Sequence, residues 1–206
     1  MPSLLGVFLA AFLVASSVLA TPVLAARRLR TCIPAFEEGA VYNVFAAGKA
    51  DETWEYVPPA SNLAATTGGA FFLSEGDAPE SGGFYITSVE GEESGTFTLS
   101  VNEQCLRTIG KNRALTSGPC ALVKSTFTLS CTSCPSSSSP PTAGTPVGRA
   151  CTLTSRASPG YCVASVSPSS SSSSVPSGNG SRGLGGLEAR KCQTRARAQS
   201  WDLVRA

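Results

Sequence analysis

Thr-Phe-Thr-Leu-Ser occupies residues 96–100 and recurs unchanged at residues 126–130. In each copy, apolar side chains alternate with hydroxyl side chains, which is the two-residue period of a strand with one buried face. The segments Trp54–Val57 and Trp201–Val204 show a similar alternation on either side of this pair. The pattern predicts strands in equivalent positions of an all-β fold.

Other short runs rich in β-branched and aromatic residues are separated by Gly, Pro, Asn and Ser. Together with the segments above, we expect strands at residues 42–45, 54–57, 70–73, 84–89, 96–101, 121–123, 126–131, 151–154, 161–163 and 201–204. Outside residues 1–20, no window shows the period of an amphipathic helix. The sequence therefore predicts a small, disulfide-bonded, single all-β domain over residues 29–206.

The beginning of the chain predicts export. Leu4–Val14 is an apolar run of the length found in signal peptides, and it is too short to span a membrane. Val18 and Ala20 place short side chains before a cleavage point, so residues 1–20 are expected to be a signal peptide and the protein secreted. Arg27-Arg28 resembles a dibasic processing site, which would make residues 21–28 a propeptide. The alternative is two exposed arginines at the start of the mature chain.

All eight cysteines follow this region: Cys32, Cys105, Cys120, Cys131, Cys134, Cys151, Cys162 and Cys192. An even number of cysteines in an exported chain predicts four disulfides. Cys131 and Cys134 form a CxxC, which also occurs in zinc and redox sites. Because there is no second CxxC and no histidine, the disulfide interpretation is favoured and no metal site is expected.

Two low-complexity stretches, residues 135–148 and 165–186, are rich in Ser, Pro and Gly. We expect both to be disordered loops inserted into the domain, because they offer little apolar surface to bury. The second stretch contains Asn179-Gly180-Ser181, the only N-glycosylation sequon in the chain. Asn179 is therefore a predicted glycosylation site.

Gln199-Ser200-Trp201 follows Cys192, and Cys162 precedes that cysteine by thirty residues. Cys105, Cys120 and Phe127 repeat the order of a cysteine pair followed by an aromatic strand. This order resembles the ricin-B-type β-trefoil, a lectin-like family, over residues 103–206.

The resemblance implies disulfides between Cys105 and Cys120 and between Cys162 and Cys192. It also implies that Trp201 and Phe127 are core residues. In sugar-binding members an aspartate follows the first Cys-hydrophobic pair. Arg107 and Ala164 stand in those places here and cannot accept the same hydrogen bonds from a sugar.

Phe97 and Trp54 occupy comparable positions in the other two alternating segments. We therefore expect them to be structural aromatics as well, with their rings on the buried face of the sheet.

The absence of histidine removes the triads that rely on an imidazole base, and oxidised cysteines are not nucleophiles. A glycosidase-type carboxylate pair remains the one catalytic alternative. Adjacent acids such as Glu92-Glu93 are typical of solvated turns, so we expect no enzyme activity and no cofactor.

Charge is divided unevenly along the chain. Residues 31–103 hold twelve acids and one base, a formal charge of −11, and residues 104–206 hold twelve bases and two acids, a formal charge of +10. One interpretation is that the halves interleave and neutralise each other. The other is a basic face that binds an anionic polysaccharide, phospholipid or acidic protein. Its members would be Arg107, Lys111, Arg113, Arg190, Lys191, Arg195 and Arg197.

The sequence therefore favours a secreted, non-catalytic binding module whose ligand it does not identify, and the resemblance to ricin-B lectins implies an extracellular carbohydrate. The alternative is a small secreted interaction protein, such as a hydrolase inhibitor or a host-directed effector, with a protein ligand. We expect no nucleic-acid partner, because the chain is exported and its bases do not interleave with aromatics. No later segment is apolar enough to span a membrane, and we expect a monomer.

Overall fold

The computed structural model describes residues 31–58, 69–75, 83–120, 123–135, 140–166, 183–194 and 196–206. The predicted signal peptide (residues 1–20), the predicted propeptide (residues 21–28) and the predicted glycosylation site Asn179 lie outside these ranges.

The described residues form twelve strands and one short 3-10 helix. The elements are β1 (Val41–Ala46), β2 (Glu52–Val57), β3 (Ala70–Glu75), β4 (Phe84–Ser88), β5 (Thr96–Val101), β6 (Gln104–Thr108), β7 (Leu115–Gly118), β8 (Thr126–Ser130), β9 (Pro146–Ser155), β10 (Tyr161–Val166), β11 (Gly183–Lys191), η2 (Arg197–Gln199) and β12 (Trp201–Arg205). The predicted all-β, single-domain class is confirmed.

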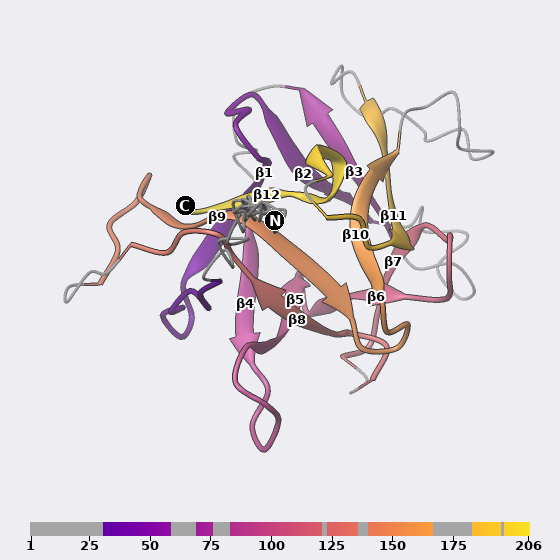
Figure 1. Ribbon diagram of the computed structural model, residues 1–206, viewed down its shortest axis with the longest axis horizontal. Helices are drawn as coiled ribbons and strands as arrows, with labels where there is room; N and C mark the ends of the chain where they lie inside the picture. The colour runs from indigo at the N-terminus through magenta and orange to yellow at the C-terminus, as the bar shows by residue number, and fades with distance from the viewer. Residues whose placement is uncertain are drawn as a thin grey trace, which may run out of the picture.

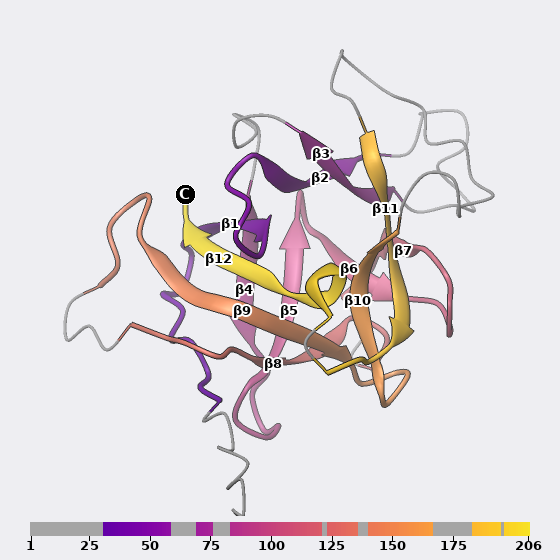
Figure 2. The same cartoon turned by 45° about the horizontal axis from the view of Figure 1, so that its top comes forward.

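The strands form one antiparallel sheet that closes on itself as a β-barrel (Figure 1). A ring of pairings runs from β1 through β12, β9, β8, β5 and β4 and returns to β1. The pairs β2–β3, β6–β7 and β10–β11 extend this ring, and β3 joins them by pairing with both β7 and β11 (Figure 2). The two copies of Thr-Phe-Thr-Leu-Ser are β5 and β8, which pair directly so that Phe97 lies opposite Phe127.

The assignment of residues 103–206 to a ricin-B-type β-trefoil is wrong. These residues are not a unit with their own core, because β1–β5 supply part of the same closed barrel and β12 lies between β1 and β9. The cysteine pair followed by an aromatic strand, on which the assignment was based, has a local explanation. Cys105 and Cys120 join the ends of the β6–β7 hairpin, and Phe127 fills the barrel interior, as an antiparallel barrel with cross-linked hairpins requires.

The barrel interior holds the large apolar side chains that alternate along the strands. Trp201 and Phe127 have no exposed surface, and Trp54 and Phe97 are 1% and 6% exposed. All four predicted structural aromatics therefore lie in the core, where full burial stabilises the fold by about 1.5–3 kcal/mol for each large apolar side chain. Trp54 also packs edge to face on Phe84, at a centroid distance of 5.9 Å.

The eight cysteines form four disulfides: Cys32–Cys134, Cys105–Cys120, Cys131–Cys151 and Cys162–Cys192. The CxxC at Cys131 and Cys134 is therefore divided between two different bonds. Four disulfides in a domain of this size are typical of an oxidising, extracellular setting.

Ordered strands occupy parts of the two predicted low-complexity loops. β9 begins at Pro146, inside the stretch 135–148, and the next residue, Val147, is only 4% exposed. β10 continues to Val166, and β11 begins at Gly183, so both ends of the stretch 165–186 are paired to each other. Strand pairing uses backbone groups, which Gly and Ser provide as well as any residue does.

Three observed strands, β6, β7 and β11, were not predicted. Of the strand predicted at residues 121–123, residues 121–122 lie outside the described residues. Val123 lies in a turn and is 63% exposed.

Candidate binding surfaces

The charges of the two halves of the chain are only partly paired. Among the described residues there are four ion pairs, and two of them join the acidic half to the basic half: Glu92 with Arg156, and Glu37 with Arg205. The hydrogen bond from Arg156 to Glu92, followed by the negative charge of Glu92, raises the pKa of Arg156 above its ordinary value. The other two pairs, Lys49–Glu52 and Glu188–Arg190, lie within one half each.

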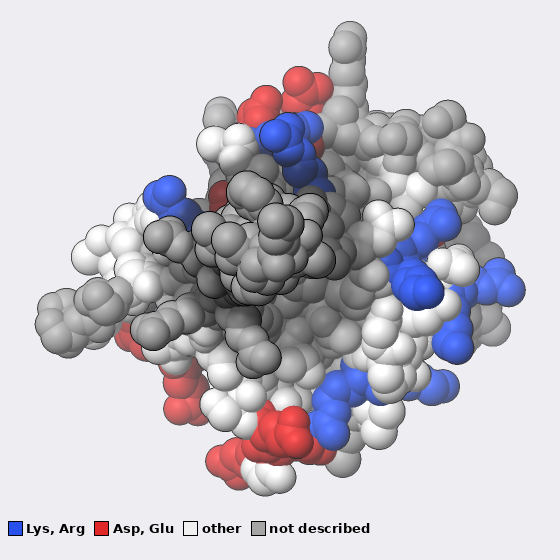
Figure 3. All heavy atoms as spheres, viewed as in Figure 1, with Lys and Arg blue, Asp and Glu red and all other residues white. Residues whose placement is uncertain are grey.

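The space-filling view shows the charges separated on the surface. Lys and Arg gather on the right-hand side, over β7, β10 and β11, while Asp and Glu gather below, around the β4–β5 hairpin, and also at the top beside a separate blue group (Figure 3). Interleaving of the two halves therefore does not describe the right-hand side of this face.

The loop between β6 and β7 brings cations from two distant parts of the chain together. Asn112 donates its backbone N–H to the carbonyl of Ala189 at 2.7 Å, and Ala189 donates to the carbonyl of Arg113 at 3.0 Å. These bonds hold the loop along β11. We define the basic cluster as Lys111, Arg113, Arg190 and Lys191.

Tyr161 lies beside two members of the basic cluster, Lys111 and Lys191. It pairs with Lys191 across β10 and β11, and the Lys111 ammonium lies 5.5 Å from the centroid of the Tyr161 ring. That distance is within the range of a cation–π contact. Lys111, Arg113 and Lys191 are exposed, and no carboxylate of the described residues forms an ion pair with them.

Arg190 is the member of the basic cluster with a carboxylate partner. Its guanidinium lies 2.7 Å from Oε2 of Glu188, whose side chain is 11% exposed. Arg190 also borders a shallow hollow of about 340 Å³ that Ala164 and Gln199 line. Ala164 is 3% exposed, so this position contributes an apolar wall to the hollow.

The other predicted cations belong to other elements or lie outside the described residues. Arg107 is in β6 opposite Thr116, and its Nε is buried with no hydrogen-bond partner among the described residues. Arg197 begins η2, and Arg195 lies outside the described residues. The structure therefore places four of the seven predicted basic residues on two neighbouring segments, the β6–β7 loop and the end of β11.

A second surface is a groove of about 600 Å³ beside β4, which we call the acidic groove. The segment 33–36 forms one wall, and residues 86–97 of β4, β5 and their hairpin form the other. Its apolar lining includes Ile33, which is 44% exposed, and Phe36. Four glutamates line the groove, and no lysine or arginine does: Glu38, Glu90, Glu92 and Glu93.

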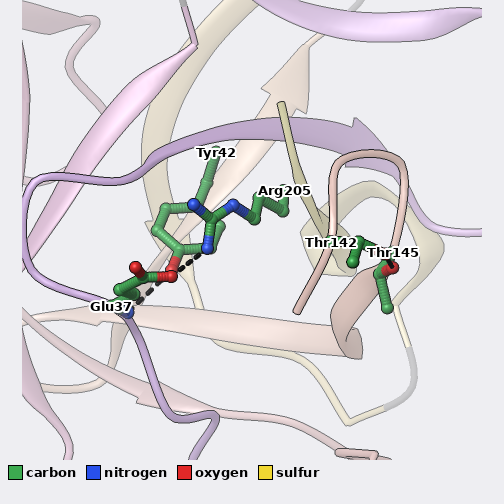
Figure 4. A network of polar contacts seen from close by, with 5 residues as sticks. All are labelled: Glu37, Tyr42, Thr142, Thr145 and Arg205. Carbon is green, nitrogen blue, oxygen red and sulfur yellow. Dashed lines mark hydrogen bonds and ion pairs between the residues drawn. The ribbon is translucent and has the colours of Figure 1, made fainter. Parts of the chain in front are cut away.

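The wall of the acidic groove is held near both of its ends by a disulfide, hydrogen bonds and an ion pair. The Cys32–Cys134 disulfide holds one end, and Cys32 and Cys131 exchange two backbone hydrogen bonds of 2.8 and 2.9 Å. At the other end, the Glu37 N–H donates to the Tyr42 hydroxyl at 2.8 Å while the Glu37 carboxylate pairs with Arg205 (Figure 4).

A short loop behind the same wall holds Arg205 in place. The Arg205 N–H donates to the carbonyl of Thr145 at 3.0 Å, and the Thr142 and Thr145 hydroxyls share a hydrogen bond of 2.9 Å (Figure 4). These contacts therefore hold the wall of the groove in position without a ligand.

Sequence analysis did not identify the acidic groove or the role of Tyr161. The signal for the groove was Ile33, an apolar residue between Cys32 and Pro34 that belongs to no alternating segment. The signal for Tyr161 was weak, because the basic residues beside it in the fold, Lys191 and Lys111, are thirty and fifty residues away along the chain.

The part of the chain that the structure describes holds no group of three or more His, Cys, Asp and Glu side chains that could bind a metal ion. Within the same residues, no helix has the length and apolar character needed to cross a membrane.

No family model matches the sequence, and no curated protein matches it either. The solved structures that align with this chain include the following two. A mosquitocidal holotoxin aligns with 84% of this chain at 6% identity and a TM-score of 0.56, over 18% of the toxin chain. A GlcNAcα1-4Gal-releasing endo-β-galactosidase from Clostridium perfringens aligns with 83% of this chain at 13% identity and a TM-score of 0.46, over 33% of that chain.

The protein thus spans only a fraction of the length of both chains. At these identities the likeness to the toxin concerns the fold alone, and the comparisons identify no ricin-B-type trefoil.

Proposed function

We propose that this protein is a non-catalytic binding module that acts outside the cell, and that its basic cluster binds an anionic polysaccharide. One observation carries the proposal. Lys111 of the β6–β7 loop lies over the ring of Tyr161, which pairs with Lys191 of β11, and neither these two cations nor Arg113 of the same loop has an ion-pair partner among the described residues.

The chemistry of the cluster suits a sulfated or carboxylated sugar chain. Cations that gather on one face raise the local concentration of a polyanion and speed its association. The ring of Tyr161 is half-buried beside them and offers a flat apolar face next to the charges. A polysaccharide presents repeated anionic groups on sugar rings, so it can contact the cations and the aromatic ring together.

Several features support a non-catalytic role. The sequence contains no histidine, and all eight cysteines are in disulfides. Of the adjacent acids considered for catalysis, Glu92 is exposed and paired with Arg156. The mosquitocidal holotoxin shows that a similar fold exists as one part of a much larger protein, which fits a module that binds rather than reacts.

The test is binding to immobilised dextran sulfate, with uncharged dextran as the matched matrix. The triple variant Lys111→Ala/Arg113→Ala/Lys191→Ala should bind dextran sulfate at least about tenfold more weakly at physiological salt. Each cation near an anionic surface contributes about 1 kcal/mol, and every 1.4 kcal/mol is about tenfold in affinity.

The control is Lys49→Ala/Lys124→Ala/Arg149→Ala, which removes the same number of exposed cations from other places. It should retain affinity within about threefold. Equal losses in the two triple variants would show that net charge, and not the basic cluster, governs binding. Equal binding of the parent to dextran and dextran sulfate would contradict an anionic ligand.

A further inference from the structure

The acidic groove contains a strand edge that no other strand covers. β4 pairs with β5 from Tyr85 to Ser88, but it pairs with β1 only at Phe84 and Tyr85. The side of β4 that faces away from β5 therefore has no strand partner over residues 86–88 among the described residues. Unpaired edges of this kind accept an additional strand.

The direction of the backbone groups follows from the register. Val89 donates its N–H to the carbonyl of Thr96 on the β5 side at 3.1 Å. Because successive residues in an antiparallel pair alternate in direction, Thr87 also faces β5 while Ile86 and Ser88 face the other way. In the described part of the chain, no backbone hydrogen bond joins Ile86 or Ser88 to the wall at residues 33–38.

The negative charge at the rim of the groove favours a positively charged ligand. Glu38, Glu90 and Glu93 are exposed, and none of them forms an ion pair with a described residue. Between these carboxylates lie the apolar side chains of Ile33 and Phe36. An extended segment with alternating basic and apolar residues would match both features, since its side chains point alternately to opposite faces.

We propose that the acidic groove binds an extended, lysine- or arginine-rich segment of another protein, which adds to β4 as a strand at Ile86 and Ser88. In strand addition, main-chain hydrogen bonds supply affinity and alternate side chains supply specificity. The fixed position of the wall lowers the ordering cost of binding, because Glu37 and Cys32 are already fastened. The proposal concerns a different face from the basic cluster and does not depend on polysaccharide binding.

The first test uses peptides and the unaltered protein. A capped Lys-Val-Lys-Val-Lys-Val-Lys peptide should bind with measurable heat in calorimetry. The same peptide with N-methyl groups on alternate residues keeps its charge but cannot pair as a strand on the methylated side. Methylation of the residues that face β4 should weaken binding at least about tenfold, and a Glu-Val-Glu-Val-Glu-Val-Glu peptide should not bind.

The second test changes the groove. Ser88→Pro removes an N–H that faces the groove, and proline is tolerated on an exposed strand edge. This variant should bind the lysine peptide at least about tenfold more weakly. Glu90→Gln/Glu93→Gln should also weaken binding about tenfold, whereas the matched pair Glu75→Gln/Glu103→Gln, exposed elsewhere, should not.

Equal affinity for the methylated and unmethylated peptides would overturn strand addition, even if Ser88→Pro failed to fold. Equal affinity of the two glutamine pairs would overturn the role of the rim. Dextran sulfate binding by the same variants separates the two proposals, because loss of peptide binding at the groove should leave it unchanged.

Discussion

Trp54 of β2 and Trp201 of β12 meet edge to face inside the barrel, with ring centroids 4.9 Å apart and ring planes at 78°. Neither indole exposes more than 1% of its surface. The two residues are 147 positions apart in the sequence. Their contact joins the first and last parts of the described chain in a single core.

Replacing either tryptophan by alanine should lower the free energy of unfolding by about 3–5 kcal/mol, the cost typical of a large aromatic removed from a core. Urea denaturation of Trp54→Ala and Trp201→Ala measures both effects. A variant that melts like the parent would show that its indole is outside the core.

The corresponding phenylalanine variants separate packing from hydrogen bonding. Trp201 donates its indole N–H to the carbonyl of Val163 at 3.1 Å, whereas the Trp54 indole nitrogen is buried with no partner among the described residues. Trp201→Phe should therefore destabilise the protein by about 1 kcal/mol more than Trp54→Phe, because it leaves a buried carbonyl unsatisfied. The opposite order would contradict this assignment.

Asp202 connects the turn after β1 to β9. Its carboxylate accepts hydrogen bonds from the N–H groups of Gly48 at 3.1 Å and Ala150 at 2.8 Å. Ala150 has a φ of 46°, so this bond supports a backbone conformation that alanine rarely adopts.

Asp202→Ala should cost about 2 kcal/mol, and Asp202→Asn about half as much, since the amide retains one acceptor oxygen. Thermal or urea melts measure the difference. Asp51, an exposed aspartate in a turn, is the control, and Asp51→Ala should stay within about 0.5 kcal/mol of the parent. Similar effects at Asp51 and Asp202 would contradict the linking role.

The Cys32–Cys134 disulfide spans 102 residues of sequence, and Cys105–Cys120 spans 15. By chain entropy, closing loops of these lengths stabilises a protein by about 4.7 and about 3 kcal/mol. Cys32→Ser/Cys134→Ser should therefore lose more stability than Cys105→Ser/Cys120→Ser in denaturant melts under oxidising conditions. A smaller loss at Cys32–Cys134 would show that the wall of the acidic groove is held mainly by its other contacts.

Much of the strand content could be predicted from local alternation. The repeated Thr-Phe-Thr-Leu-Ser segments are indeed neighbouring strands, and Trp54 and Trp201 begin or lie within strands where their alternation indicated. These strands could be predicted because burial of one face of a strand imposes a period of two on the sequence.

β11, one of the strands that were not predicted, lacks this alternation. β11 starts with Gly-Leu-Gly-Gly, which is typical of a linker, yet it pairs with both β3 and β10. Glu188 in its centre is nearly buried and forms an ion pair with Arg190. A charged residue therefore stands at a buried position, and the alternation of apolar and polar residues fails there. The binding surfaces were harder to predict from the sequence than the strands. The basic cluster depends on two backbone hydrogen bonds, one donated by Asn112 to Ala189 and one donated by Ala189 to Arg113, and no local sequence pattern predicts these contacts.

The most direct test of the proposed function is a nuclear magnetic resonance titration of the 15N-labelled protein with low-mass dextran sulfate. Binding at the basic cluster should shift or broaden the amide signals of residues 111–113 and of Tyr161, Arg190 and Lys191. The signals of residues 33–38 and 86–93 should stay unchanged. Changes centred on the acidic groove, or spread evenly over exposed cations such as Lys49 and Arg149, would contradict the account.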